Sequence, residues 1–221
     1  MSNTIRLSSG VRAANDDVAR QNRALFAERK LAVLNLISSP GSGKTSLLER
    51  MAARWGGALA VITGDIQTAL DADRLTRAGA AAVQIETGGA CHLTAAMVRK
   101  AAAGMDLDNK RLLVVENVGN LVCPAAVDLG ETAKIAVLSV AEGDEKVAKY
   151  PALFLRAAAV VVSKTDLLPH VKFSVDRVRN DCRALNRDVK LFPLSCTTGD
   201  GFEAWMEYCA GLTKRIKSSL S

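Results

Sequence analysis

The sequence predicts an α/β fold in which a doubly wound, mostly parallel sheet is covered by helices on both faces. Seven short runs rich in Val, Ile and Leu show little polar alternation, which is typical of strands buried on both faces. Helical patterns separate most of these runs, and such alternation indicates parallel pairing. We expect residues 1–30 to form a tail and a short N-terminal helix, and residues 31–221 to form one domain.

The elements are expected in a regular order along the chain. Residues 1–15 are polar and are expected to be mobile, whereas residues 16–30 place Val18, Leu25 and Phe26 among charges, as an amphipathic helix does. The predicted strands are 32–37, 58–63, 82–85, 111–115, 135–140, 159–162 and 190–194. The predicted helices are 46–55, 71–78, 93–103, 145–156 and 173–185.

Composition excludes several classes of protein. The chain is 49% hydrophobic and 24% charged, the balance of an ordinary globular protein. No apolar run approaches the ~20 residues of a membrane span, and residues 1–15 lack the apolar core of a signal peptide, so we expect a cytoplasmic protein without membrane contact. The net charge of +6 is scattered and only 4% of residues are aromatic, so nucleic-acid binding is not expected.

The segment Ser38 to Thr45, SSPGSGKT, follows the first predicted strand and precedes a helical pattern. Gly41 and Gly43 lack a Cβ, so the backbone can curl and point its N–H groups at phosphate. Lys44 can reach the β- and γ-phosphates, and Thr45 can place its hydroxyl on Mg²⁺. A P-loop usually begins with Gly, and here Ser38 occupies that position. The predicted phosphate-binding residues are Gly41, Ser42, Gly43, Lys44, Thr45 and Ser46.

A second motif predicts which base is bound. Ser163-Lys164-Thr165-Asp166 resembles the Asn-Lys-x-Asp motif of GTPases, in which the aspartate accepts hydrogen bonds from guanine N1–H and the 2-amino group. Lys164 is expected to lie along the base and brace the phosphate loop. Ser163 replaces the usual Asn, which we expect to weaken one bracing contact. The loop that begins with Ser195 and Cys196 resembles the loop that closes over guanine.

Two acidic residues end predicted strands beside the phosphate loop. Asp65 follows the second strand and Glu116 follows the fourth. Acids at such positions commonly hold Mg²⁺ directly or through water, so both are candidates, with Thr45, for Mg²⁺ ligation and, with Lys44, for catalysis. Asp71 and Asp73 are nearby alternatives that are expected to be surface or capping residues.

The five cysteines are an odd number, which in a cytosolic chain argues against a disulfide framework. Cys91 and His92 are adjacent, and Cys123 follows a later strand; thiolate with imidazole suits Zn²⁺ or Ni²⁺. Spacing alone leaves two alternatives open, a metal site or chance proximity of buried thiols. Cys182 and Cys209 lie in helical patterns and are expected to be packed, and His170 is expected in an exposed loop.

Five motifs occur in a characteristic order: SSPGSGKT, GDIQT followed by DADR, ETGGACHL, ENVGNLVCP and SKTDLLP. Together they resemble the HypB family, over about residues 16–208. Its members are dimerising P-loop GTPases of the SIMIBI class that assist nickel insertion during [NiFe]-hydrogenase maturation.

The resemblance implies GTP or GDP and Mg²⁺ as ligands, and a Ni²⁺ or Zn²⁺ site formed by Cys91, His92 and Cys123 at a homodimer interface. Three ligands per protomer are too few for a closed tetrahedral site, so a partner chain or water would complete it. The resemblance also implies that the nucleotide state alters dimer geometry and metal affinity, and that the nickel chaperone HypA and the hydrogenase large subunit are partners. The N-terminal Cys-x-x-Cys-Gly-Cys motif and the His-rich tract of some members do not occur in these 221 residues.

Three alternatives remain open from the sequence. A urease-type nickel accessory GTPase typically carries Cys-Pro-His, whereas Cys91 and His92 are adjacent here. A P-loop small-molecule kinase would need an Arg-rich lid, and none is evident. The third alternative is a binding module that is controlled by nucleotide but does not hydrolyse it. An assay of GTP hydrolysis distinguishes such a module from a GTPase.

Overall fold

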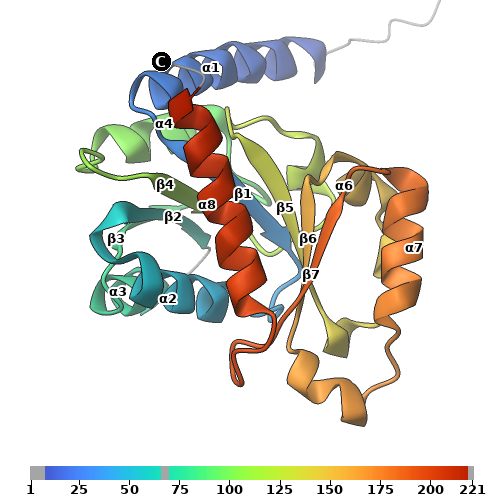
Figure 1. The fold of residues 1–221 in the computed structure, drawn as a ribbon. Helices are drawn as coiled ribbons and strands as arrows, with labels where there is room; N and C mark the ends of the chain where they lie inside the picture. The colour runs from blue at the N-terminus through green and yellow to red at the C-terminus, as the bar shows by residue number, and fades with distance from the viewer. Residues whose placement is uncertain (1–7, 66–69, 219–221) are drawn as a thin grey trace, which may run out of the picture.

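The computed structural model describes residues 8–65 and 70–218, without the side chains of residues 8–11 and 65–71. Its strands form one seven-stranded sheet in the order β3-β2-β4-β1-β5-β6-β7, and every neighbouring pair is parallel (Figure 1). The strands are β1 (Ala32–Ser38), β2 (Leu59–Asp65), β3 (Ala81–Glu86), β4 (Leu112–Glu116), β5 (Ala133–Ser139), β6 (Ala159–Ser163) and β7 (Lys190–Pro193).

Eight α-helices and four short 3₁₀ helices connect these strands in the described residues. The α-helices are α1 (Ser8–Glu28), α2 (Lys44–Trp55), α3 (Leu70–Arg77), α4 (Ala95–Ala103), α5 (Lys146–Lys149), α6 (Pro151–Arg156), α7 (Val175–Leu185) and α8 (Phe202–Ser218). The 3₁₀ helices are η1 (Gly56–Ala58), η2 (Cys123–Ala126), η3 (Val140–Glu142) and η4 (Thr165–His170). None of the described helices combines the length and apolar character that crossing a membrane requires.

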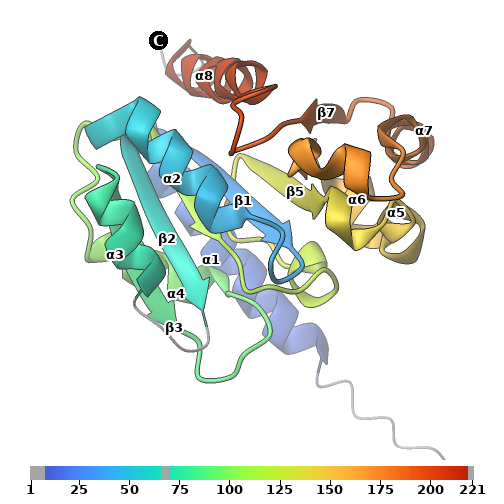
Figure 2. The same ribbon diagram turned by 90° about the horizontal axis from the view of Figure 1, so that it is seen from below.

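The helices bury the sheet on both faces (Figure 2). Helices α2, α3 and α8 pack on one face, where Trp205 is the largest fully buried side chain. On the other face, Phe26 of α1 packs with α4, and Phe154 of α6 packs with α7. Side chains along β1 alternate between these clusters, because successive residues of a strand point to opposite faces.

This topology determines where a ligand can bind. From β1 the chain adds β2 and β3 on one side of the sheet, with connecting helices on one face, and then adds β5, β6 and β7 on the other side, with helices on the opposite face. In open parallel sheets, ligands bind at the carboxyl ends of the strands where the winding reverses. That point is the end of β1, where the phosphate loop begins.

The structure confirms the predicted fold class and all seven strands, and it corrects three helix predictions. The first helix begins at Ser8, so residues 8–15 are helical rather than mobile, while residues 1–7 lie outside the described part of the chain. Asn15 contributes to this extension, because its side chain accepts a hydrogen bond from Ala95 N and donates one to Asp128 O.

The other two corrections concern later helices. The predicted helix 145–156 is two helices, separated at Tyr150 because Pro151 has no N–H to continue the first one. Helix α8 has no counterpart with predicted bounds, although Phe202, Trp205, Met206 and Cys209 form the i, i+3, i+4, i+7 stripe of an amphipathic helix. That pattern around Cys209 could have predicted the helix from sequence.

Candidate functional site

The phosphate loop has the conformation that its glycines were expected to permit. Gly41 and Gly43 have φ angles of 73° and 92°, which L side chains rarely adopt. Lys44 begins α2 directly afterwards, so the free N–H groups and positive dipole end of that helix face the loop. The loop is therefore a ready site for an anion.

Ser38, in the position usually held by Gly, organises this loop. The Lys44 ammonium donates to Ser38 Oγ over 2.7 Å, and the Ser42 hydroxyl donates to the same oxygen over 2.6 Å. Ser38 Oγ in turn donates to Ser39 O over 2.8 Å. The serine thus orients the ammonium group toward the loop, a contact that the sequence did not predict.

One cavity of about 270 Å³ lies between the phosphate loop and the ends of β2 and β4. Lys44, Thr45 and Glu116 line it, as the predicted roles require, and Glu116 is only 7% exposed. Thr63 also lines it, with a buried hydroxyl that has no hydrogen-bond partner among the described residues. A buried, unsatisfied hydroxyl beside a carboxylate suits a hydrated cation or a positioned water.

Asp65 can be placed only by its backbone. It is the last residue of β2 and follows Gly64, which lines the phosphate cavity; its side chain lies outside the described part of the structure. The same holds for the side chain of Asp71, whereas Asp73 is exposed on α3 and does not line the cavity.

A second cavity, of about 240 Å³, adjoins the other side of the loop. Its lining includes the predicted residues Gly43, Ser46, Lys164, Asp166 and Cys196. The two cavities share the phosphate loop as their common wall, an arrangement that accommodates phosphates on one side and a base on the other.

The predicted bracing contacts are present around the base cavity. Lys164 has a left-handed φ of 60°, and its ammonium donates to Gly41 O over 2.7 Å. The Ser163 hydroxyl donates to Ser42 O over 2.6 Å, so a serine in the usual Asn position still holds the phosphate loop.

Ser195 positions Asp166 and does not line the base cavity itself. It is fully buried, donates to Asp166 Oδ1 over 2.5 Å, and accepts from the N–H groups of Thr197 and Thr198 over 3.1 Å each. One carboxylate oxygen of Asp166 is thereby held in place. Arg50, which the sequence did not single out, fixes the same loop by donating to Cys196 O over 2.6 Å.

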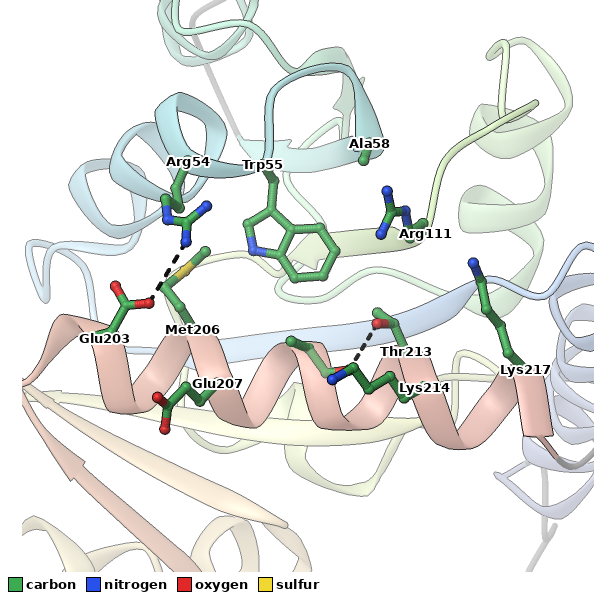
Figure 3. A pocket seen from close by; sticks show the side chains of 11 residues that line it. Arg54, Trp55, Ala58, Arg111, Glu203, Met206, Glu207, Thr213, Lys214 and Lys217 are labelled. Carbon is green, nitrogen blue, oxygen red and sulfur yellow. Dashed lines mark hydrogen bonds and ion pairs between the residues drawn. The ribbon is translucent and has the colours of Figure 1, made fainter.

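A further cavity, of about 440 Å³, lies away from this chemistry. It separates the end of α2 and η1 from α8, and Figure 3 shows Trp55 and Arg111 beside it with the Arg54–Glu203 ion pair at one end. Ala58 and Arg111 precede β2 and β4, so this cavity is at the amino edge of the sheet, opposite the phosphate loop.

The structure brings together the three predicted soft ligands. One ligand atom each of Cys91, His92 and Cys123 lies within 4.8 Å of the other two, and Cys91 Sγ lies 3.4 Å from His92 Nδ1. Cys91 is exposed, and the other two are half-buried. Two thiolates and an imidazole at this separation can hold Ni²⁺ or Zn²⁺ and leave room for further ligands.

The pKa values of several thiols are raised, for different reasons. The Cys91 thiol donates a hydrogen bond to Cys123, which raises the pKa of Cys91, so a metal that binds this sulfur must displace its proton. Burial raises the pKa of Cys182 to about 12 and that of Cys209 higher still. Both side chains are fully buried, as predicted, and His170 is exposed at the end of η4. Burial also raises the pKa of Cys196.

Comparison with known proteins places the chain among GTP-dependent maturation factors. The nucleotide-binding domain of the CobW/HypB/UreG family matches residues 32–193. The chain is 46% identical to the hydrogenase maturation factor HypB of Escherichia coli (strain K12) over 196 residues, covering 88% of this chain and 68% of that protein. It is 48% identical to HypB of Azotobacter vinelandii over 209 residues, covering 94% and 69%.

Solved structures agree with this relationship. The crystal structure of HypB from Helicobacter pylori in complex with nickel superposes with a TM-score of 0.87 at 40% sequence identity, covering 91% of this chain and 96% of that one.

Proposed function

This chain belongs to the CobW/HypB/UreG family, as a HypB hydrogenase maturation GTPase, and from that premise we propose that it binds nickel at Cys91, His92 and Cys123 and releases it under the control of bound GTP. GTP is its substrate, and water is the acceptor of the γ-phosphoryl group. Nickel is the cargo, to be inserted into a [NiFe]-hydrogenase. Zn²⁺ is a second metal that the same ligands suit.

The observation that carries the proposal is the position of the soft-ligand cluster. Cys91 and His92 follow β3, and Cys123 lies beyond the loop that leaves the phosphate cavity at Asn117. One short loop, residues 117–123, therefore connects the phosphate cavity to a ligand of the bound metal. Binding of one ligand can therefore change the affinity for the other, and thermodynamic linkage requires the effect to be reciprocal.

The nucleotide pocket supports hydrolysis through positioning and charge. Loop N–H groups and Lys44 bind the phosphates, and Asp166 accepts from the guanine edge. Thr45 and Glu116, with Asp65, would hold Mg²⁺, and the unsatisfied hydroxyl of Thr63 supports a hydrated ion there. Mg²⁺, when bound, neutralises charge on the phosphates. We expect slow turnover, because no arginine of the described residues lines the phosphate cavity.

The metal site supports assembly into a homodimer. Three ligands leave a tetrahedral ion one ligand short. Cys91 is exposed, and the adjoining Val122 has 63% of its surface exposed, so both side chains are accessible to a partner. A second copy meeting this face would cover Val122 and supply ligands. A nickel chaperone such as HypA and a hydrogenase large subunit are the partners that the family relationship supports.

Nickel titration tests the proposal. Purified protein is titrated with Ni²⁺ while loaded with a non-hydrolysable GTP analogue or with GDP, and its mass in solution is measured alongside. We expect the two nucleotide states to differ in nickel affinity and in oligomeric state. Equal affinities and an unchanged assembly in both states would overturn nucleotide-controlled nickel binding.

A hydrolysis assay separates the GTPase from the kinase alternative. Phosphate release is followed without any acceptor other than water, with Lys44→Ala as the background control. A GTPase releases phosphate steadily, whereas a kinase is nearly silent until its acceptor is added. The family relationship and the guanine-side contacts favour the GTPase.

A further inference from the structure

The loop after β4 connects the phosphate cavity to the metal cluster. Its first residues, Asn117, Val118 and Gly119, line the phosphate cavity, and it continues to Cys123 at the start of η2. Any movement of this loop on binding a γ-phosphate therefore displaces Cys123 directly. Cys91 and His92 follow a different strand, so a separate contact must pass the displacement to them.

Asn117 joins the two segments through one oxygen atom. Its side chain is fully buried, and Oδ1 accepts from Val118 N over 3.0 Å and from Leu93 N over 3.1 Å. Nδ2 donates to Asn35 Oδ1 on β1 over 3.2 Å. The amide cannot rotate without breaking a bond to Val118, on the phosphate side, or to Leu93, on the metal side, and a buried donor left without a partner is costly.

We propose that Asn117 is the positioning residue that couples the nucleotide to the metal cluster. The proposal rests on the function proposed above and names the residue through which that coupling acts. When a γ-phosphate shifts Val118, the shared oxygen moves with it, and Leu93 follows. Leu93 directly succeeds His92, so the imidazole and the Cys91 thiolate change position relative to Cys123.

Two close packing contacts make this connection stiff. A Cβ added to Gly119 would lie 2.9 Å from Pro40 Cγ and 3.1 Å from Pro40 N, so the β4 loop touches the phosphate loop with no space between them. A Cβ added to Gly64 would lie 2.8 Å from the Leu93 side chain. Close-packed segments transmit a displacement instead of absorbing it.

Asn120 provides a matched comparison within the same loop. Its Nδ2 donates to Cys91 O over 3.3 Å, and its Oδ1 accepts from Val122 N over 2.9 Å. These bonds shape the metal cluster locally. Asn120 does not line the phosphate cavity, so its loss should affect nickel binding equally whichever nucleotide is bound.

The experiment compares Asn117→Ala, Asn120→Ala and the parent protein. For each, the nickel Kd is measured with the GTP analogue and with GDP, at saturating nucleotide. Allosteric couplings commonly amount to about 5–150-fold, and we expect the parent ratio of the two Kd values to lie in that range. Asn117→Ala should bring the ratio to within about twofold of one while nickel binding in the GDP state persists; Asn120→Ala should change both Kd values and keep the ratio.

The outcomes distinguish the two proposals. If the parent ratio is one, nucleotide-controlled nickel binding fails and the relay fails with it. If the parent ratio is large and Asn117→Ala retains it, only the role of Asn117 is overturned. Should Asn117→Ala not fold, amide exchange of Leu93 and Val118 is compared in the parent between the GTP-analogue and GDP states. Both rates should change together, and a change at Val118 without one at Leu93 overturns the relay.

Discussion

The hydroxyl of Ser163 donates a hydrogen bond of 2.6 Å to the carbonyl of Ser42 and so joins the strand that carries the base-recognition motif to the phosphate loop. Both residues are nearly or fully buried. A serine therefore makes the bracing contact for which related motifs use Asn, and the neighbouring bond from Lys164 to Gly41 supplies a second brace.

Ser163→Ala should weaken GTP and GDP binding about equally. The substitution leaves the Ser42 carbonyl without this donor, and the loss of such a bond costs about 1 kcal/mol, which corresponds to about a fivefold change in Kd. The two nucleotides share the braced loop, so their affinity ratio should persist. Fluorescent-nucleotide titration measures both constants. Ser163→Thr keeps the hydroxyl and serves as control; an unaltered affinity in Ser163→Ala would show that the contact is dispensable.

Asp166→Asn should relax the choice of base. The amide presents a donor where guanine also presents donors, so GTP affinity should fall on the order of 100-fold. Xanthine carries a carbonyl in place of the 2-amino group, so XTP should bind the variant better than it binds the parent. The remaining Asn oxygen can still accept from Ser195. Competition assays with GTP, XTP and ATP test this, and an unchanged preference for GTP argues against the assigned role.

Cys91→Ala should lose tight nickel binding and retain GTP binding. The exposed thiol contributes one of three clustered ligands and does not line either nucleotide cavity. Removing one thiolate typically costs orders of magnitude in affinity, and we expect about 100-fold or more. Cys182→Ala is the matched control, because that thiol is buried away from the cluster and should leave nickel stoichiometry unchanged. Parent-like nickel affinity in Cys91→Ala would place the site elsewhere.

Nickel affinity should fall as the pH falls. The raised pKa of Cys91 means that its thiol is protonated at neutral pH, so protons compete with the metal more strongly at lower pH. Because a thiol must lose its proton to bind the metal as a thiolate, we expect release of about one to two protons per metal ion and a comparable slope of log Kd against pH. Calorimetry in buffers of different ionisation enthalpy measures that release. Uptake without proton release would mean that the thiols are not ligands.

Asn22→Ala should destabilise the domain by about 2 kcal/mol, since it removes two buried hydrogen bonds between α1 and the segments it packs against. Asn22 Nδ2 donates to Ala95 O over 2.8 Å and to Leu129 O over 3.0 Å, which fixes α1 against the start of α4. Urea denaturation gives the free energy of unfolding. Glu28→Ala, at an exposed position on the same helix, should cost less than about 0.5 kcal/mol. Equal stability of both variants would show that α1 is not anchored through Asn22.

Much of the fold could be predicted because its strands are buried on both faces. Residues 159–162, for example, are Ala and three Val. A short, continuous apolar run of this kind indicates a buried strand without any knowledge of its neighbours in the fold. The break at Tyr150 and Pro151 was missed because the apolar spacing continues across it. The helical start at Ser8 depends on contacts of Asn15 with distant segments, which no local pattern contains.

In the candidate site, too, some residues could be predicted from local sequence, whereas others depend on how the chain folds. The phosphate loop and Asp166 could be predicted because their residues are close in sequence and their chemistry is specific. The proximity of Cys91 to Cys123 depends on the order of β2, β3 and β4 in the sheet, and family resemblance rather than spacing predicted it. Asn117 and Thr63 were missed; the only sequence signal is a polar residue in or directly after an apolar strand.

The three soft ligands lie outside the hydrophobic clusters of the domain, two on the loop after β3 and one at the start of η2. Replacing one of them removes no packing from these clusters, so a change of ligand carries little penalty for folding. A descendant of this chain could therefore exchange a thiolate for an imidazole, and so change which metal it prefers, without repacking its core. Under the proposed coupling, such an exchange would also change the affinity for the nucleotide.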